Sequence, residues 1–126
     1  LLTWMHKNKA DYTNTFCFLM NEKFSYNEVY NDKNLLIWKE KWKKRLKLNN
    51  NNQEKYLKLM RSVNPLIIPR NHKVEEALNA ANDGNIEPMN NLIRILKKPY
   101  INQENILKFQ MPSPHNNEKY QTFCGT

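Results

Sequence analysis

Apolar residues recur along the chain at the three- and four-residue intervals of an α-helix. The first twenty residues predict a single long helix, with one apolar face made of Leu1, Met5, Tyr12, Phe16, Leu19 and Met20. Residues 24–32 are mostly polar and are typical of a loop. Asp32 or Asn34 is suited to cap a second helix that follows this loop. The pattern therefore indicates helices from the start of the chain.

The second predicted helix has a strongly two-sided pattern. Leu35, Trp38, Trp42 and Leu46 form an apolar stripe at steps of three, four and four residues. The other face is basic, with Lys39, Lys41, Lys43, Lys44, Arg45 and Lys47. Such a helix suits a membrane surface, a calmodulin-like partner or a nucleic acid. Because the tryptophans occur at core spacing, packing is the favoured interpretation and a binding role is the alternative.

Three further helices are predicted downstream. The first covers about residues 53–62 and turns Tyr56, Leu57, Met60 and Val63 inward, before Pro65 and Pro69 prevent its continuation. The second begins at Asn71 as N-cap and ends at Gly84, which can adopt the left-handed conformation. The third has Pro88 in its first turn and stops at Pro99.

The pattern as a whole predicts an all-α fold of about five helices. A helical segment would span residues 1–98, and an irregular docked tail would span residues 99–126. At 126 residues the chain is at most one domain. No apolar run approaches the ~18 residues that a membrane span requires. No membrane association is therefore expected.

Charge and cysteine content change this picture only slightly. The net charge is +8, which suggests an anionic partner, but Lys and Asn are enriched generally and the run at residues 49–52 is of low complexity. A solvated basic surface is therefore favoured, and nucleic-acid binding is unlikely. Two cysteines are too few for a disulfide scaffold and favour a reducing compartment.

Most chemical sites are not indicated. His6, His72 and His115 do not form a metal-ligand pattern, and with only two glycines there is no glycine-rich phosphate loop. No catalytic, cofactor-binding or metal-binding residue is therefore assigned. Cys17 lies beside Phe16 and is expected to be buried and unpaired.

Cys124 is the one candidate for chemistry. It stands between Phe123 and Gly125, with Thr122 and Thr126 on either side of them, and a thiol there has little steric cover unless the tail docks. A reactive or latching thiol and an inert tail remain alternatives.

Four segments together resemble a known family. They are ADYTNTF at residues 10–16, VNPLIIPRNHKVEEALNAANDG at 63–84, PY at 99–100 and YQTFCGT at 120–126. In this order they resemble the C-terminal part of the SelO/YdiU family of kinase-like protein adenylyltransferases. The resemblance implies that the complete protein binds ATP with Mg²⁺ and transfers AMP to hydroxyl side chains of proteins.

The resemblance also implies what this segment does. The kinase-like catalytic core is expected upstream and absent from these residues, so the segment would be structural and redox-regulatory. Its implied partners are that upstream domain and the protein substrates. The implied location is cytoplasmic in bacteria and mitochondrial in eukaryotes. A small basic helical module that binds nucleic acid or an acidic protein is the alternative function.

Five residues carry the predicted site. By resemblance, Cys124 is the family's near-terminal cysteine, which pairs in some relatives with a cysteine near the active site. Asn64, Pro65, Arg70 and Asn71 belong to the shared link between two helices. The Arg70 guanidinium is suited to a carboxylate or to several backbone carbonyls. Pinning of the loop is the favoured role for Arg70, and contact with substrate or phosphate is the alternative.

Overall fold

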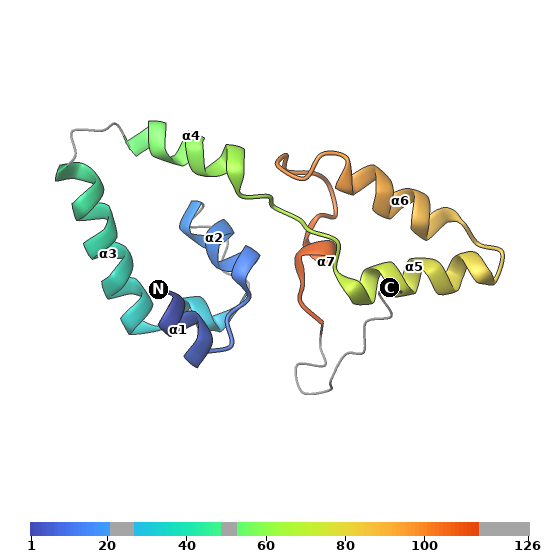
Figure 1. Ribbon diagram of the computed structural model, residues 1–126, viewed down its shortest axis with the longest axis horizontal. Coiled ribbons are helices and arrows are strands. Elements are labelled where there is room, and N and C mark those ends of the chain that lie inside the picture. The colour runs from blue at the N-terminus through green and yellow to red at the C-terminus, as the bar shows by residue number, and fades with distance from the viewer. Residues whose placement is uncertain (21–26, 49–52, 114–126) are drawn as a thin grey trace, which may run out of the picture. The chain divides into compact units, whose positions relative to one another are not determined.

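The computed structural model describes residues 1–20, 27–48 and 53–113, and these residues confirm the all-α prediction. They contain seven α-helices, one 3₁₀ helix and no strand (Figure 1). The helices are α1 (Leu2–Lys7), α2 (Tyr12–Met20), η1 (Glu28–Asn31), α3 (Lys33–Leu48), α4 (Gln53–Val63), α5 (Asn71–Asn82), α6 (Glu87–Leu96) and α7 (Leu107–Gln110).

The chain divides into two compact units, Leu1–Leu66 and Ile67–Thr126. The boundary predicted at residue 98 therefore falls inside the second unit. The segment after it, expected to be irregular, contains the short helix α7. Whether residues 99–126 act as a docked tail stays a prediction.

The single long first helix was a wrong prediction, because the chain breaks between α1 and α2. Lys9 adopts a positive φ of 49°, and its amide donates to the His6 carbonyl. Asp11 then starts α2, since its Oδ1 accepts from the Asn14 amide at 2.8 Å. An Asp whose side chain accepts a hydrogen bond from the backbone amide three residues later is a typical N-cap. The apolar spacing alone did not reveal this local signal.

The core of the first unit is a compact cluster from α2, η1 and α3. Its buried members are Cys17, Phe18, Leu19, Met20, Tyr30 and Leu35. Tyr30 comes from the stretch that was expected to be a loop, yet it is only 2% exposed. Its ring stacks on Phe18 with centroids 4.9 Å apart. A one-turn helix inside a polar stretch therefore supplies a core aromatic.

Helix α3 begins as predicted, with Asp32 as its cap. Asp32 Oδ1 accepts from the Asn34 and Leu35 amides at 2.9 and 3.1 Å, and from Trp4 Nε1 at 2.7 Å. These hydrogen bonds, led by that from Leu35, hold the pKa of the Asp32 carboxyl below its usual value. The cap therefore also ties α1 to the start of α3.

The division of α3 into an apolar and a basic face is confirmed except at Lys39. Trp38 and Trp42 pack against the core and stack on one another, with centroids 6.1 Å apart. Lys39, expected on the basic face, is only 5% exposed, and its Nζ lies 4.1 Å from the centroid of the Phe18 ring. Aromatic faces attract cations, which makes this burial of a lysine tolerable.

Helix α4 follows the predicted range but is not placed as expected. None of its residues is buried. Met60 packs against the core cluster, whereas Val63, predicted to face inward, is 62% exposed. The apolar arc of α4 is therefore wider than the surface that the first unit offers it.

In the second unit, α5 and α6 pack side by side as an antiparallel hairpin (Figure 1). The turn between them contains Gly84 with φ of 86°, as predicted. The Gly84 amide donates to the Ala81 carbonyl, and the Asn85 amide to the Ala80 carbonyl. The buried side chains of this unit include Ile67, Ala77, Leu92, Ile95, Ile106 and Phe109.

The Gln103 side chain holds the segment after α6 by hydrogen bonds to backbone carbonyls. Gln103 Nε2 donates to the carbonyls of Ile95 and Lys98 at 3.0 and 2.9 Å. The Ile95 carbonyl also accepts from the Lys98 amide at 3.2 Å, and the Lys98 carbonyl from the Ile101 amide at 3.3 Å. Residues of α5, α6 and α7 line one hollow together, so α7 lies beside the hairpin. Within the described ranges, no helix has the length and apolar character that crossing a membrane requires.

Candidate functional site

The predicted link motif begins in the first unit with Asn64 and Pro65. The Asn64 amide and its side-chain Nδ2 both donate to the Met60 carbonyl, each at 2.9 Å. The Pro65 carbonyl lies 3.6 Å from Cys17 Sγ, which donates to it. Cys17 is 1% exposed, as expected for a cysteine that behaves as a small core residue. Asn64 thus ends α4, and Pro65 adjoins the buried α2.

The motif continues in the second unit with Arg70 and Asn71, at the start of α5. Asn71 was predicted as the N-cap, but it is the first helical residue, and Arg70 occupies the cap position without a side-chain cap hydrogen bond. The Arg70 side chain points elsewhere, because its Nη2 donates to the Gln110 carbonyl at 3.1 Å. Gln110 is the last residue of α7 and is buried.

The hydrogen bond from Arg70 joins two segments forty residues apart. A guanidinium has five donors in a rigid plane, so it is suited to hold backbone carbonyls in a fixed geometry. A carbonyl partner is one of the two kinds predicted for Arg70 from sequence. Its role in the complete protein stays a prediction.

A hollow of about 360 Å³ lies beside this arginine. Its lining residues are Ile68, Pro69, Arg70, Asn71, His72, Pro112 and Ser113. Partial burial of His72, and then the charges of Lys73 and Arg70, lower the pKa of its imidazole below the usual value. His72 is therefore biased towards its neutral form.

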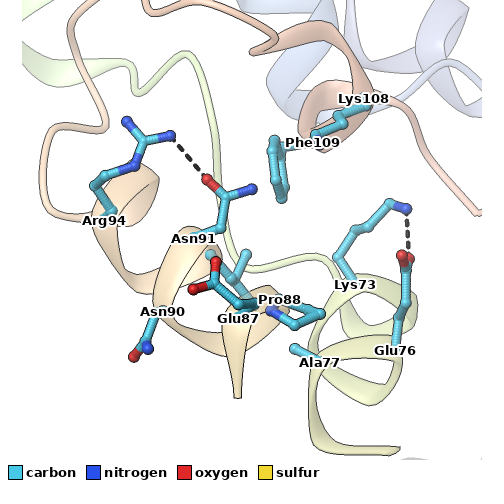
Figure 2. Close-up of a pocket in the computed structure, with 11 residues that line it drawn as sticks. Lys73, Glu76, Ala77, Glu87, Pro88, Asn90, Asn91, Arg94, Lys108 and Phe109 are labelled. Atoms are coloured by element: carbon cyan, nitrogen blue, oxygen red, sulfur yellow. Dashed lines mark hydrogen bonds and ion pairs between the residues drawn. The ribbon is translucent and has the colours of Figure 1, made fainter. Parts of the chain in front are cut away.

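A second hollow of about 460 Å³ lies between α5, α6 and α7 (Figure 2). Charged and amide side chains surround it. Lys73 pairs with Glu76 on α5, and Arg94 Nη2 donates to Asn91 Oδ1 at 2.8 Å on α6. The Phe109 ring forms an apolar wall, with Lys108 Nζ 5.1 Å from its centroid.

This second hollow lacks an obvious reactive centre. The described residues that line it include no Ser, Thr, Cys, His or Tyr. Three of its charged groups, Lys73, Glu76 and Arg94, already have partners on their own helices. A nucleophile beside a general base is the usual sign of covalent catalysis, and this lining does not supply one. The arrangement is that of a polar groove between packed helices.

Comparison with known proteins shows the family. The family model described as "Protein adenylyltransferase SelO" matches residues 1–97. The chain belongs to the SelO family. A "Protein nucleotidyltransferase YdiU" of Pelagibacter ubique is 53% identical over the whole chain, and those of Alcanivorax borkumensis and Clostridium beijerinckii are each 40% identical over the whole chain.

The chain spans 26% of the length of each of these YdiU relatives. The SelO match covers helices α1 to α6 and therefore the whole link motif from Asn64 to Asn71. The link motif that suggested the family from sequence thus lies inside the matched region.

The remaining predicted site residue, Cys124, lies outside the described residues, and so does His115. The pairing of Cys124, including any bond to Cys17, stays untested. Within the described part of this SelO chain, no three His, Cys, Asp or Glu side chains gather as metal ligands would.

Two features of the first unit were not found from sequence. One is the stack of Lys39, Phe18 and Tyr30, and the other is the bond from Trp4 to Asp32. Both join residues from different helices, so no local spacing would have revealed them. Both position elements of the core, and neither forms a reactive set.

Proposed function

We propose that this chain is the C-terminal helical part of a SelO/YdiU protein adenylyltransferase and that its own role is structural. The observation that carries the proposal is the match over residues 1–97 and over the whole chain to YdiU relatives about four times as long. A segment that covers about a quarter of such proteins is expected to act within the larger one.

The activity proposed for the complete protein is transfer of AMP to protein hydroxyl groups. The hydroxyl oxygen attacks the α-phosphorus of ATP and loses its proton, the bond to the bridging oxygen breaks, and pyrophosphate leaves. ATP and Mg²⁺ would be held by the kinase-like core outside these 126 residues. No residue of this chain is assigned to catalysis, cofactor or metal.

The structural role fits the contacts of the second unit. Arg70 donates to a backbone carbonyl of α7, and Gln103 donates to two carbonyls at the end of α6. The bonds from Arg70 and from Gln103 to Ile95 are partly buried, and hydrogen bonds from side chains to backbone carbonyls restrict the path of a chain. These side chains therefore act on the backbone of the segment itself.

A regulatory role is proposed for Cys124. Family resemblance makes it a thiol that pairs reversibly with a cysteine near the active site of the complete protein. Labelling of thiols in the full-length protein, reduced and oxidised, would detect the pair. Equal labelling of Cys124 in both states would contradict it.

Radiolabelled ATP tests the proposed activity directly. The full-length protein with Mg²⁺ and acceptor protein should transfer label from [α-³²P]ATP and none from [γ-³²P]ATP. The contrast follows because AMP retains only the α-phosphorus. Transfer from the γ position would indicate phosphorylation and would contradict the proposal. Absence of label transfer from both nucleotides would also contradict it.

One observation favours a second candidate, binding of nucleic acid or an acidic protein. Residues 1–66 contain thirteen Lys or Arg and only six Asp or Glu, and Lys44 and Arg45 on α3 are exposed. Affinity for a nucleic acid should then fall steeply as salt rises, because neutralised phosphates release counterions. Tight binding that disappears when Lys43, Lys44 and Arg45 are neutralised would support this candidate; weak binding that is independent of these residues would exclude it.

A further inference from the structure

Helix α4 has more apolar surface than the first unit covers. Its apolar residues are Tyr56, Leu57, Leu59, Met60 and Val63, yet the helix has no buried residue. At about 100° per residue these positions span an arc of about 160°, wider than the roughly 100° that a surface helix needs for its core. One side of the arc, at Met60, packs on the core cluster.

The other side of the arc is open. Leu59 and Val63 are each 62% exposed and lie four residues apart, so they are adjacent on one ridge of the helix. Lys55, also exposed, lies one turn earlier on the same ridge. The ridge thus presents two aliphatic side chains and an ammonium group at one end.

The composition of the unit indicates what would cover this ridge. Residues 1–66 have seven more basic than acidic residues, whereas residues 67–126 have one more. An acidic surface would therefore be favoured against the first unit. The YdiU relatives are about four times as long as this chain, so most of the polypeptide that would form such a surface lies outside these residues.

We infer that the Lys55–Leu59–Val63 ridge is a docking surface for the part of the full-length protein outside these 126 residues. The occupant is an apolar patch bordered by carboxylates, which would bury Leu59 and Val63 and face Lys55. This inference rests on the proposed function, because it requires the longer protein. It explains why an inward position was predicted for Val63 and not found.

Site-specific photo-crosslinking tests the ridge in the full-length protein. p-Benzoylphenylalanine is introduced at Leu59, at Val63 or at Arg61, and captured peptides are identified by mass spectrometry. Arg61 is the matched control: it is exposed on the same helix, two residues from each test position, and therefore about 200° around the axis from both. Capture of peptides from outside residues 1–126 should be about tenfold more efficient from Leu59 and Val63 than from Arg61.

Several outcomes would overturn the inference. Capture confined to residues 1–126 would show that this chain covers its own ridge. Capture of a second copy, increasing with protein concentration, would show self-association. Equal yields from all three positions would show that the ridge is open.

The failure of this inference is distinguishable from failure of the proposed function. AMP transfer is measured separately on the unmodified full-length protein. Crosslinks from the ridge without AMP transfer would leave the docking surface intact and remove the activity. AMP transfer without such crosslinks would contradict the docking surface and leave the proposed activity intact.

Discussion

The two units reach their folds by different means. The first unit packs six large or medium side chains, two of them stacked aromatics, into one cluster and also buries Lys39 over Phe18. The second unit is a helical hairpin with a glycine turn, whose following segment is tied down by side chains that donate to backbone carbonyls. Side-chain packing is therefore the main source of stability in the first unit. Backbone conformation contributes more to the stability of the second.

Truncation of a core aromatic should give the largest effect and should separate the units. Phe18→Ala removes the ring that stacks on Tyr30 and lies under Lys39, and the free energy of unfolding should fall by about 3–5 kcal/mol. Hydrogen exchange of the full-length protein should rise in peptides from residues 1–66. An equal rise in residues 67–113 would show that the units do not unfold separately.

Substitution of the turn glycine should act on the second unit. No atom lies within 4 Å of where a Cβ would sit on Gly84, so Gly84→Ala should cost only the left-handed backbone penalty, about 1–2 kcal/mol. Exchange should rise in peptides from α5 and α6. Gly84→Asn, which tolerates this conformation better, should lose less; an alanine variant as stable as the parent would refute the backbone explanation.

The buried lysine gives a smaller effect in the first unit. Lys39→Met keeps most of the apolar stem but removes the charge over Phe18, and should lower stability by about 1 kcal/mol. Lys41→Met, at an exposed position of the same helix, is the control and should change stability by less than about 0.5 kcal/mol. Thermal unfolding of the two variants measures the difference, and equal melting temperatures would contradict a stabilising role for the Lys39 charge.

The pH dependence of stability should differ between the units, with the smallest effects. The pKa of His72 is lower in the folded state than its ordinary value of 6.5. As pH falls below 6.5, the unfolded state therefore takes up a proton on His72 before the folded state does, and the second unit should lose stability. Asp32 also has a lowered pKa, so its contribution is present above pH 3.8 and is lost as pH falls below that value. His72→Gln should remove the first loss and Asp32→Asn the second, as followed by hydrogen exchange against pH.

These differences also explain which features were predictable from sequence. The predicted left-handed conformation of Gly84 and the predicted cap at Asp32 were correct, because local backbone chemistry decides both. Lys39 and Tyr30 were misplaced because their burial depends on Phe18, which comes from another helix. The predicted burial of Val63 was wrong because periodicity reports that a face is apolar, and not whether this segment contains its partner.

The candidate site was predicted less completely than the fold. Arg70 was expected to hold a carboxylate or backbone carbonyls, and the structure gives it the Gln110 carbonyl. Nothing in the spacing of the two residues, forty positions apart, could have named that partner. Asn71 was assigned the cap one residue too late because Asn is a preferred cap residue, whereas Arg is not.

The most direct test of the structural role is Arg70→Ala in the full-length protein, with Arg94→Ala as control. Arg94 donates to Asn91 within α6, whereas Arg70 joins α5 to α7. Arg70→Ala should lower the free energy of unfolding by about 1–3 kcal/mol. The kcat/KM for AMP transfer, measured well below the melting temperature, should stay within about twofold of the parent. A large loss of AMP transfer with an unchanged melting temperature would contradict the structural role and place Arg70 in contact with substrate or phosphate.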